Sequence, residues 1–372
     1  MSPDQGPLQQ LSALGQSVWV DFLSRESIRG GHLQQLIDDY AVVGATSNPT
    51  IFQKAMSEGN AYDEQLHELR GGPVADTFWA LAEQDITDAC EVFRPVWEAS
   101  GRRDGYVSLE VDPRLAYDTL QTFREAIHLH ETVDRPNLMV KIPATKPGLA
   151  AIEDVIAAGH SINVTLIFSL GRYAEVAESY IRGLERLVAE GGDPSAVASV
   201  ASFFVSRIDT EADRRLQELG PTQPDAQQLQ GKLAIANARL AYRHYLEVFA
   251  GPRWEYLVGK GATPQRVLWA STSTKNPAYP DTLYVDELIG PDTVNTMPEE
   301  TIEAYQEHGT PEPRLQNAIA DAEQLLVELA RVGVDYDDLT DTLEREGVEK
   351  FSESVDQLLA ALSAKQESLA PA

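Results

Sequence analysis

NLMVKIPATKPGLAAIEDVIAAG, residues 137–159, is the stretch that decides the fold. It begins with an apolar run of strand length and continues as an amphipathic helical segment that Pro147 opens and Gly159 closes. A buried strand followed directly by such a helix is the unit from which parallel sheets are built. The stretch therefore predicts a βα unit, and its strand carries one charged residue, Lys141.

Seven further strand-length runs repeat this pattern, with helix-length segments between them. They are SVWVDF at 17–22, AVVGATS at 41–47, GYVSLEV at 105–111, INVTLIF at 162–168, VASVASFFV at 197–205, RVLWAST at 266–272 and TLYVDELI at 282–289. Eight strands that alternate with helices favour a closed (β/α)8 TIM barrel over an open doubly wound sheet. The sequence thus predicts an α/β barrel with additional N- and C-terminal helices.

The domain organisation follows from the same reading. We predict a single domain over residues 1–372, with the barrel core at about 16–310 and a helical C-terminal extension at about 311–372, where the chain is charged and strand signals cease. A break at 220–225, GPTQPD, separates two predicted helices of the barrel's outer ring.

Charge and composition exclude several classes of function. The chain has 58 Asp and Glu against 30 Lys and Arg, a formal net charge of -28, which would repel nucleic acid and anionic membranes. No apolar stretch approaches membrane-spanning length, and the N-terminus does not resemble a signal peptide. The single cysteine, Cys90, excludes an internal disulfide and suits a reducing compartment. We expect a cytoplasmic protein without nucleic-acid or membrane partners, either a monomer or a homodimer, and no P-loop, dinucleotide or metal motif predicts a cofactor.

Lys141 is the strongest candidate for chemistry. In a (β/α)8 barrel the active site lies at the carboxyl ends of the strands, so polar residues late in apolar strands are informative. A lysine held in apolar surroundings is pushed toward its neutral form, and a neutral amine can attack a ketone to form a Schiff base. The strand alone leaves a second interpretation open, in which the lysine reaches out to solvent or pairs with a carboxylate.

Other strand ends supply groups that such chemistry needs. The carboxylates of Asp21 and Glu110 could move protons, or they could cap helices or pair inertly with the lysine. The amides of Asn48 and Asn163 could bind substrate hydroxyls, although asparagine at a strand end also makes turns. The positive charge that an anionic substrate requires is available from Arg207 and Lys275, each of which could instead form a surface ion pair.

Several motifs, taken together and in order, resemble the transaldolase family, in particular its longer bacterial subgroup. They are VWVDF at 18–22, TSNPTIF at 46–52, SLEVDP at 108–113, MVKIPAT at 139–145, INVTLIFS at 162–169, SFFVSRID at 202–209 and the segment WASTSTKNPAYPDTLYVDELIGPDTVNTMP at 269–298. The resemblance covers roughly the first 300 residues. It implies a class I aldolase-type barrel that transfers a dihydroxyacetone unit through a lysine Schiff base, in the non-oxidative pentose phosphate pathway and without a metal.

The resemblance also implies roles for individual residues. Lys141 would form the Schiff base with fructose 6-phosphate or sedoheptulose 7-phosphate, and Asp21 would act as acid and base. A catalytic water would be held by Glu110 and Thr165. The dihydroxyacetone unit would be bound by Asn48, Asn163 and Ser202. The phosphate would be bound by Arg207.

Two positions bear on how far the resemblance extends. Lys275 stands where better-known members have an arginine, so it can supply charge to a phosphate but not a bidentate fork. The second is Phe204. In the resembling family this position is phenylalanine in members that transfer the unit to an aldose phosphate, such as glyceraldehyde 3-phosphate or erythrose 4-phosphate. It is tyrosine in fructose-6-phosphate aldolases. That aldolase activity is the first alternative, and a non-catalytic sugar-phosphate-binding protein is the second.

Overall fold

Eight parallel strands close into a barrel in the order β1 to β8, which confirms the predicted fold class. The structure is a computed structural model that describes residues 6–220 and 223–368. The strands are β1 (Gln16–Val20), β2 (Val42–Thr46), β3 (Val107–Glu110), β4 (Leu138–Pro143), β5 (Ile162–Ile167), β6 (Ser199–Phe204), β7 (Arg266–Ala270) and β8 (Thr293–Met297). The barrel closes where β1 pairs with β8, from Gln16 beside Thr293 to Val20 beside Met297.

The eighth strand is not where the sequence predicted it. TLYVDELI at 282–289 forms the short helix α13 (Leu283–Glu287), and β8 follows it. The real strand, TVNTM, is largely polar because its side chains bond to neighbouring strands inside the barrel: Thr293 accepts a hydrogen bond from Gln16 at 3.0 Å, and Asn295 accepts one from Thr272 at 2.8 Å. A search for apolar runs therefore misses this strand.

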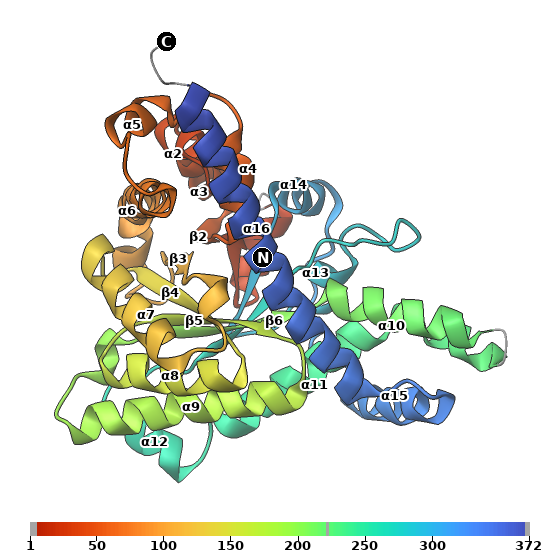
Figure 1. Cartoon of the computed structure of the whole chain (residues 1–372). Coiled ribbons are helices and arrows are strands. Elements are labelled where there is room, and N and C mark those ends of the chain that lie inside the picture. The colour runs from red at the N-terminus through yellow and green to blue at the C-terminus, as the bar shows by residue number, and fades with distance from the viewer. Residues whose placement is uncertain (1–5, 221–222, 369–372) are drawn as a thin grey trace.

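Helices surround the barrel (Figure 1). The predicted helices at 147–159 and 171–192 are α8 and α9, and α1 is an added N-terminal helix. Of the predicted break at 220–225, residues 221 and 222 lie outside the described residues, as do 1–5 and 369–372 of the predicted domain. The helices before β5 are α1 (Pro7–Ala13), α2 (Arg25–Arg29), α3 (His32–Tyr40), α4 (Pro49–Ser57), α5 (Asp63–Glu68), α6 (Val74–Ala99), η1 (Pro113–Leu115), α7 (Thr119–Val133) and α8 (Lys146–Ala157). Those after β5 are α9 (Leu170–Ala189), η2 (Pro194–Ala196), α10 (Ser206–Leu219), η3 (Pro224–Leu229), α11 (Leu233–Val248), α12 (Pro252–Val258), α13, α14 (Glu299–His308), α15 (Ile319–Val332) and α16 (Tyr336–Ser368).

The two ends of the barrel are filled differently. At the amino ends of the strands, Arg266 pairs with Asp104 at 2.9 Å and donates a hydrogen bond to Ser17 at 2.8 Å, with all three residues buried. A buried ion pair therefore lies at that end. At the carboxyl ends the register places Glu110 beside Lys141 and Lys141 beside Asn163, so three polar residues share one level.

The longest helix, α16, crosses the carboxyl end of the barrel. Figure 1 shows it in blue, passing in front of the strands from α15 to the neighbourhood of α4 and α5. Its inward face is a stripe of buried residues at helical spacing, namely Leu339, Leu343, Gly347, Phe351, Val355, Leu358 and Leu362. The C-terminal extension therefore covers the end of the barrel at which active sites form.

Candidate active site

A pocket of about 190 Å³ opens at the carboxyl ends of the strands. It gathers eight of the ten predicted site residues from segments far apart in the sequence: Asp21, Asn48, Lys141, Thr165, Ser202, Phe204, Arg207 and Lys275. The other two, Glu110 and Asn163, are buried beside Lys141 in the strand register. The sequence thus predicted a set of residues that the fold brings together.

Lys141 lies in β4, every residue of which is buried. Its Nζ is 3.3 Å from Oε2 of Glu110 and donates a hydrogen bond to the carbonyl oxygen of Ser47 at 3.2 Å. The two charged side chains are only 5% and 2% exposed, so the pair that the sequence left open as an alternative is present. Burial raises the pKa of Glu110 above its ordinary value, and the charge of Lys141 is the main opposing influence.

The Lys141–Glu110 pair is close in distance but not aligned as a hydrogen bond. Within the described parts of the chain, neither carboxylate oxygen of Glu110 has a hydrogen-bond partner, and the buried hydroxyl of Thr165 also has none. Buried oxygens without a hydrogen-bond partner are uncommon and costly, and each one calls for an explanation such as a bound ligand or water. The lysine therefore has polar groups next to it whose hydrogen-bonding capacity is unused.

Asp21 follows the end of β1 and is fixed by groups that the sequence analysis did not name. Thr46 donates a hydrogen bond to its Oδ1 at 2.6 Å, and the hydroxyl of Thr46 is 2.7 Å from that of Thr296. Burial raises the pKa of Asp21, opposed by the charge of Lys141, the hydrogen bond from Thr46 and the charge of Arg207. The position of Thr46 at the end of β2, beside Asn48, is the signal that could have found it.

The polar side chains of β5 and β6 form a chain of hydrogen bonds. Ser202 donates to Oδ1 of Asn163 at 2.7 Å, and Nδ2 of Asn163 donates to the hydroxyl of Ser108 at 3.0 Å. Asn48 lines the pocket and also caps α4, since its Oδ1 accepts from the backbone N–H of Ile51 at 3.1 Å. Oδ1 of Asn48 thus has a structural role, as a helix cap.

Arg207 and Lys275 form the cationic part of the pocket. Arg207 lies in the first turn of α10, directly after β6, and Lys275 lies in the loop after β7, where it donates a hydrogen bond to Ser273 at 2.6 Å. Neither cation forms a salt bridge with any of the residues that the structure describes, whereas most other arginines of the chain do. In a protein of net charge -28, two unpaired cations in one pocket mark a place for an anion.

Phe351 is a pocket residue that the sequence analysis missed. It belongs to α16, and its ring centroid is 5.8 Å from Nζ of Lys141 and 5.9 Å from Cζ of Arg207. The other ring beside Arg207 is that of Phe204, at 5.0 Å. The signal was the spacing of apolar residues in the C-terminal helix, which places Phe351 on its buried face.

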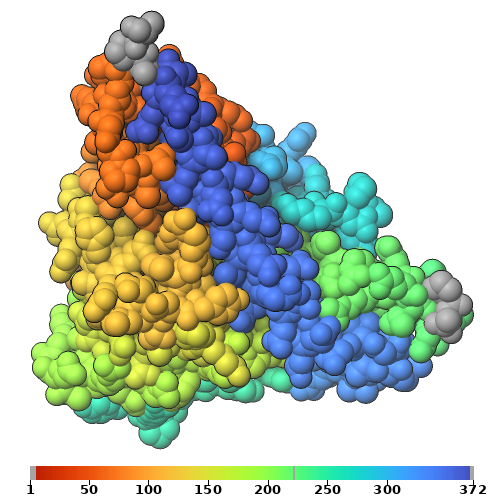
Figure 2. All heavy atoms as spheres, in the orientation of Figure 1, coloured from red at the N-terminus to blue at the C-terminus, as the bar shows by residue number. Residues whose placement is uncertain are grey.

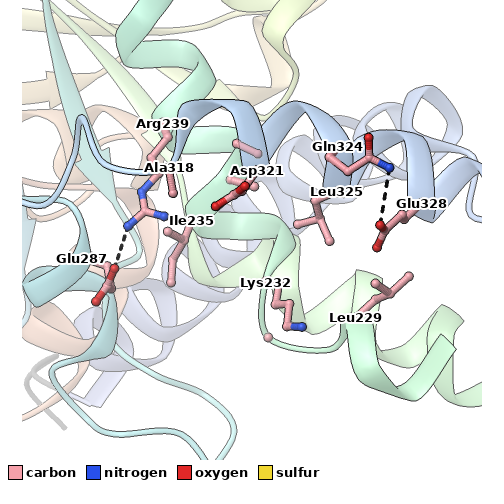
Figure 3. Close-up of a pocket in the computed structure, with 13 residues that line it drawn as sticks. Leu229, Lys232, Ile235, Arg239, Glu287, Ala318, Asp321, Gln324, Leu325 and Glu328 are labelled. Atoms are coloured by element: carbon pink, nitrogen blue, oxygen red, sulfur yellow. Dashed lines mark hydrogen bonds and ion pairs between the residues drawn. The ribbon is translucent and has the colours of Figure 1, made fainter. Parts of the chain in front are cut away.

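A larger pocket of about 430 Å³ lies between α11 and α15 (Figure 3). It contains none of the predicted residues, and its polar groups largely bond to one another. Arg239 pairs with Glu287 at 2.7 Å, and Gln324 donates to Glu328 at 3.4 Å.

Among residues 6–220 and 223–368, no group of three potential metal ligands is assembled, and no helix is long and apolar enough to cross a membrane. The lysine pocket is thus the candidate active site.

These features define a class of protein, a (β/α)8 barrel with a buried lysine and a cationic pocket at the carboxyl ends of its strands. The family model described as Transaldolase/Fructose-6-phosphate aldolase matches residues 18–362, a range that includes most of α16. A protein named Transaldolase from Parafrankia sp. (strain EAN1pec) is 55% identical over 356 residues, covering 95% of this chain and 96% of its own length.

Two further relatives, both also named Transaldolase, match over similar lengths. That from Acidothermus cellulolyticus is 54% identical and covers 97% of each chain, and that from Mycobacterium ulcerans is 51% identical and covers 100% of each. The chain belongs to the transaldolase/fructose-6-phosphate aldolase family, as the sequence motifs predicted.

Proposed function

We propose that the protein is a transaldolase, which moves a dihydroxyacetone unit from sedoheptulose 7-phosphate or fructose 6-phosphate to glyceraldehyde 3-phosphate or erythrose 4-phosphate. The names of its full-length relatives support the activity. The observation that carries the mechanism is a lysine that is only 5% exposed, lies in the pocket and has a buried carboxylate 3.3 Å away.

The first step is formation of the Schiff base. Glu110, whose pKa is raised by burial, accepts a proton from the Lys141 ammonium, and the neutral amine attacks the ketone carbon of the substrate. The carbinolamine then loses water to give an iminium ion. The unpaired oxygens of Glu110 and Thr165 are the groups that would hold the water that shuttles these protons.

Carbon–carbon cleavage follows at the bond between C3 and C4. Asp21 accepts the proton of the C4 hydroxyl, the C4 oxygen forms a carbonyl, and the electrons of the broken bond move into the iminium to give an enamine. Thr46 and Thr296 keep the carboxylate of Asp21 in one orientation. The aldose phosphate leaves, and an acceptor aldose phosphate re-forms the bond by the reverse sequence.

The remaining pocket residues bind and orient the substrate. Arg207 and Lys275 hold the phosphate, while Asn48 and the Asn163–Ser202 pair bind the hydroxyls of the three-carbon unit. Because acceptor and donor both carry a phosphate, the same two cations serve both halves of the reaction. The buried thiol of Cys90 is consistent with action in the reducing cytoplasm, either as a monomer or as a homodimer.

A fructose-6-phosphate aldolase would use the same lysine but release dihydroxyacetone to water. Phe204 lines the pocket and supplies no hydroxyl next to the enamine, which favours transfer. The second alternative, a non-catalytic sugar-phosphate-binding protein, is not favoured by the relatives, which are named Transaldolase.

The experiment that tests the proposal is borohydride reduction of the protein mixed with fructose 6-phosphate, followed by peptide mass spectrometry. We expect a reduced three-carbon adduct on Lys141, none on Lys275, and none on any lysine of the folded Lys141→Ala variant. An adduct confined to another lysine, or no adduct under conditions that trap a known Schiff-base aldolase, would overturn the mechanism. An acceptor assay then separates transfer from free aldol cleavage.

A further inference from the structure

The helix α16 is fastened on both sides of the pocket. Near its start, Tyr336 accepts a hydrogen bond from the backbone N–H of Leu170 at 3.0 Å and donates one to Asn237 at 2.7 Å. Near its end, Lys365 pairs with Asp63 at 2.9 Å. Figure 2 shows the helix as a continuous blue band over the surface between these attachments. It therefore lies over the pocket as a fixed cover.

A glycine brings the middle of α16 close to the barrel. A Cβ added at Gly347 would lie 2.9 Å from Cδ2 of Leu166, which is closer than such atoms pack. Leu166 itself has a φ of 59°, at the point where the pairing of β5 with β6 is irregular. Helix and strand thus meet directly, and one helical turn further on Phe351 enters the pocket.

The ring of Phe351 occupies a defined place in the site. It is 4% exposed, and it lies near both the amine of Lys141 and the guanidinium of Arg207, at 5.8 and 5.9 Å. In the proposed mechanism Lys141 is bonded to the former ketone carbon of the substrate, and Arg207 binds the phosphate at the other end. The ring is therefore placed against the carbon chain between the Schiff base and the phosphate, and it contributes apolar surface there.

We infer that Phe351 decides the fate of the three-carbon unit on Lys141, favouring transfer to an aldose phosphate over release to water. This inference rests on the proposed function. After cleavage the enamine has two fates. Its carbon can attack the carbonyl carbon of an acceptor, or it can take up a proton, after which water adds to the iminium carbon and the carbon–nitrogen bond breaks. The second route yields dihydroxyacetone and the free amine of Lys141.

Water hydrolyses an iminium on Lys141 at the end of both routes, but the routes differ in what first reacts with the enamine. Release begins when solvent delivers a proton to the enamine carbon, whereas transfer uses that carbon to attack the acceptor before any water is needed. An apolar ring beside Nζ removes space that water would fill, and exclusion of water is a general means of protecting reactive intermediates from hydrolysis. Phe204 is the other aromatic ring of the pocket, and it also flanks Arg207. Through Phe351, the C-terminal helix α16 thus contributes to the preference of the site for transfer over release.

The test compares three variants of the full chain. Phe351→Ala removes the ring, Phe351→Leu keeps an apolar cover, and Leu358→Ala removes a buried side chain of the same helix face that does not line the pocket. With fructose 6-phosphate as donor and erythrose 4-phosphate as acceptor, the ratio of released dihydroxyacetone to transferred product is measured for each.

We expect Phe351→Ala to raise this ratio about tenfold, mainly through the kcat of release rather than the KM for the donor, and the two other variants to stay within about twofold of the parent. An unchanged ratio in folded Phe351→Ala, or an equal rise in Leu358→Ala, would overturn the inference. If Phe351→Ala does not fold, Phe351→Thr replaces the ring with a small polar side chain that admits water, and an unchanged ratio in that folded variant would likewise overturn the inference. A parent protein that transfers nothing would instead refute the proposed function.

Discussion

Replacement of Lys141 by methionine tests the buried charge pair at the centre of the site. The substitution keeps an unbranched apolar stem and removes the cation, so that the carboxylate of Glu110 stays buried without its partner. Both side chains are almost fully buried, at 5% and 2% exposure, so solvent gives little compensation. Breaking such a pair on one side costs about 3–5 kcal/mol of unfolding free energy. We expect a loss of that size at alkaline pH.

The loss should depend on pH in one direction. Burial raises the pKa of Glu110, and removal of Lys141 takes away the main influence that lowers it. The folded variant then holds a proton that the unfolded chain, with a Glu pKa of about 4.3, has already released. The unfolding free energy of the variant therefore falls as pH rises from about 4.3 to the folded pKa, by up to about 1.4 kcal/mol per pH unit, and stays low above it.

Urea denaturation of the parent, Lys141→Met and Lys141→Met/Glu110→Gln at about pH 5.5 and about pH 8.5 measures this effect. The single variant should be destabilised more at the higher pH, and the double variant should regain most of the loss because its buried group is neutral. An equal loss of stability in the single variant at both pH values, or a double variant no more stable than the single one, would contradict the predicted effect of the buried carboxylate.

Three further outcomes follow from the site and its cover. Asp21→Asn should lower kcat/KM by about 10²–10⁴, and undiminished turnover by the variant would exclude Asp21 as the base. The activity of the parent should rise with pH as Asp21 loses its proton. That rise should occur above the usual Asp pKa of about 3.9, because burial raises the pKa of Asp21. Arg207→Lys keeps the charge but loses the planar fork, so steady-state kinetics should show the KM for phosphorylated donors rising about tenfold, and an unaltered KM would place the phosphate elsewhere. Tyr336→Phe removes the hydroxyl that joins Leu170 to Asn237 and should lower the unfolding free energy by about 1–3 kcal/mol in urea, so a change below about 0.5 kcal/mol would contradict the anchoring role.

Seven strands could be predicted because each lies in a largely apolar run. Six of them are buried at every residue, as in β4, and in β2 only Val43 is partly buried. The eighth could not, because TVNTM lies inside a ring of hydrogen bonds and shows few apolar residues. The run TLYVDELI has β-branched and aromatic residues, yet Tyr284, Val285, Leu288 and Ile289 are buried at a spacing that suits a helical turn. The composition of residues 282–289 therefore suggested a strand where the chain forms α13. The true strand, β8, could not be recognised because its side chains are polar and bond inside the barrel.

The predicted site residues could be found because a barrel brings the ends of all its strands to one place. The resemblance to family motifs then selected among them. Thr46, Thr296 and Phe351 were missed for another reason. A strand end or an apolar spacing could have indicated that Thr46 and Phe351 matter, but the contacts of all three with distant side chains are set by the fold. The contribution of α16 in particular depends on how a distant helix docks, which only the three-dimensional arrangement shows.

The position of Phe351 has a consequence for the synthesis of the chain. All eight strands precede it in the sequence, so the ribosome has made every barrel strand before it adds this residue. A product cut short after β8 would contain all ten predicted site residues but not the ring beside Lys141. Under the proposed mechanism, such a product would have the reactive lysine but lack the ring that we infer favours transfer. The ring is thus added after every other residue that lines the pocket, so the pocket is complete only when α16 has been made.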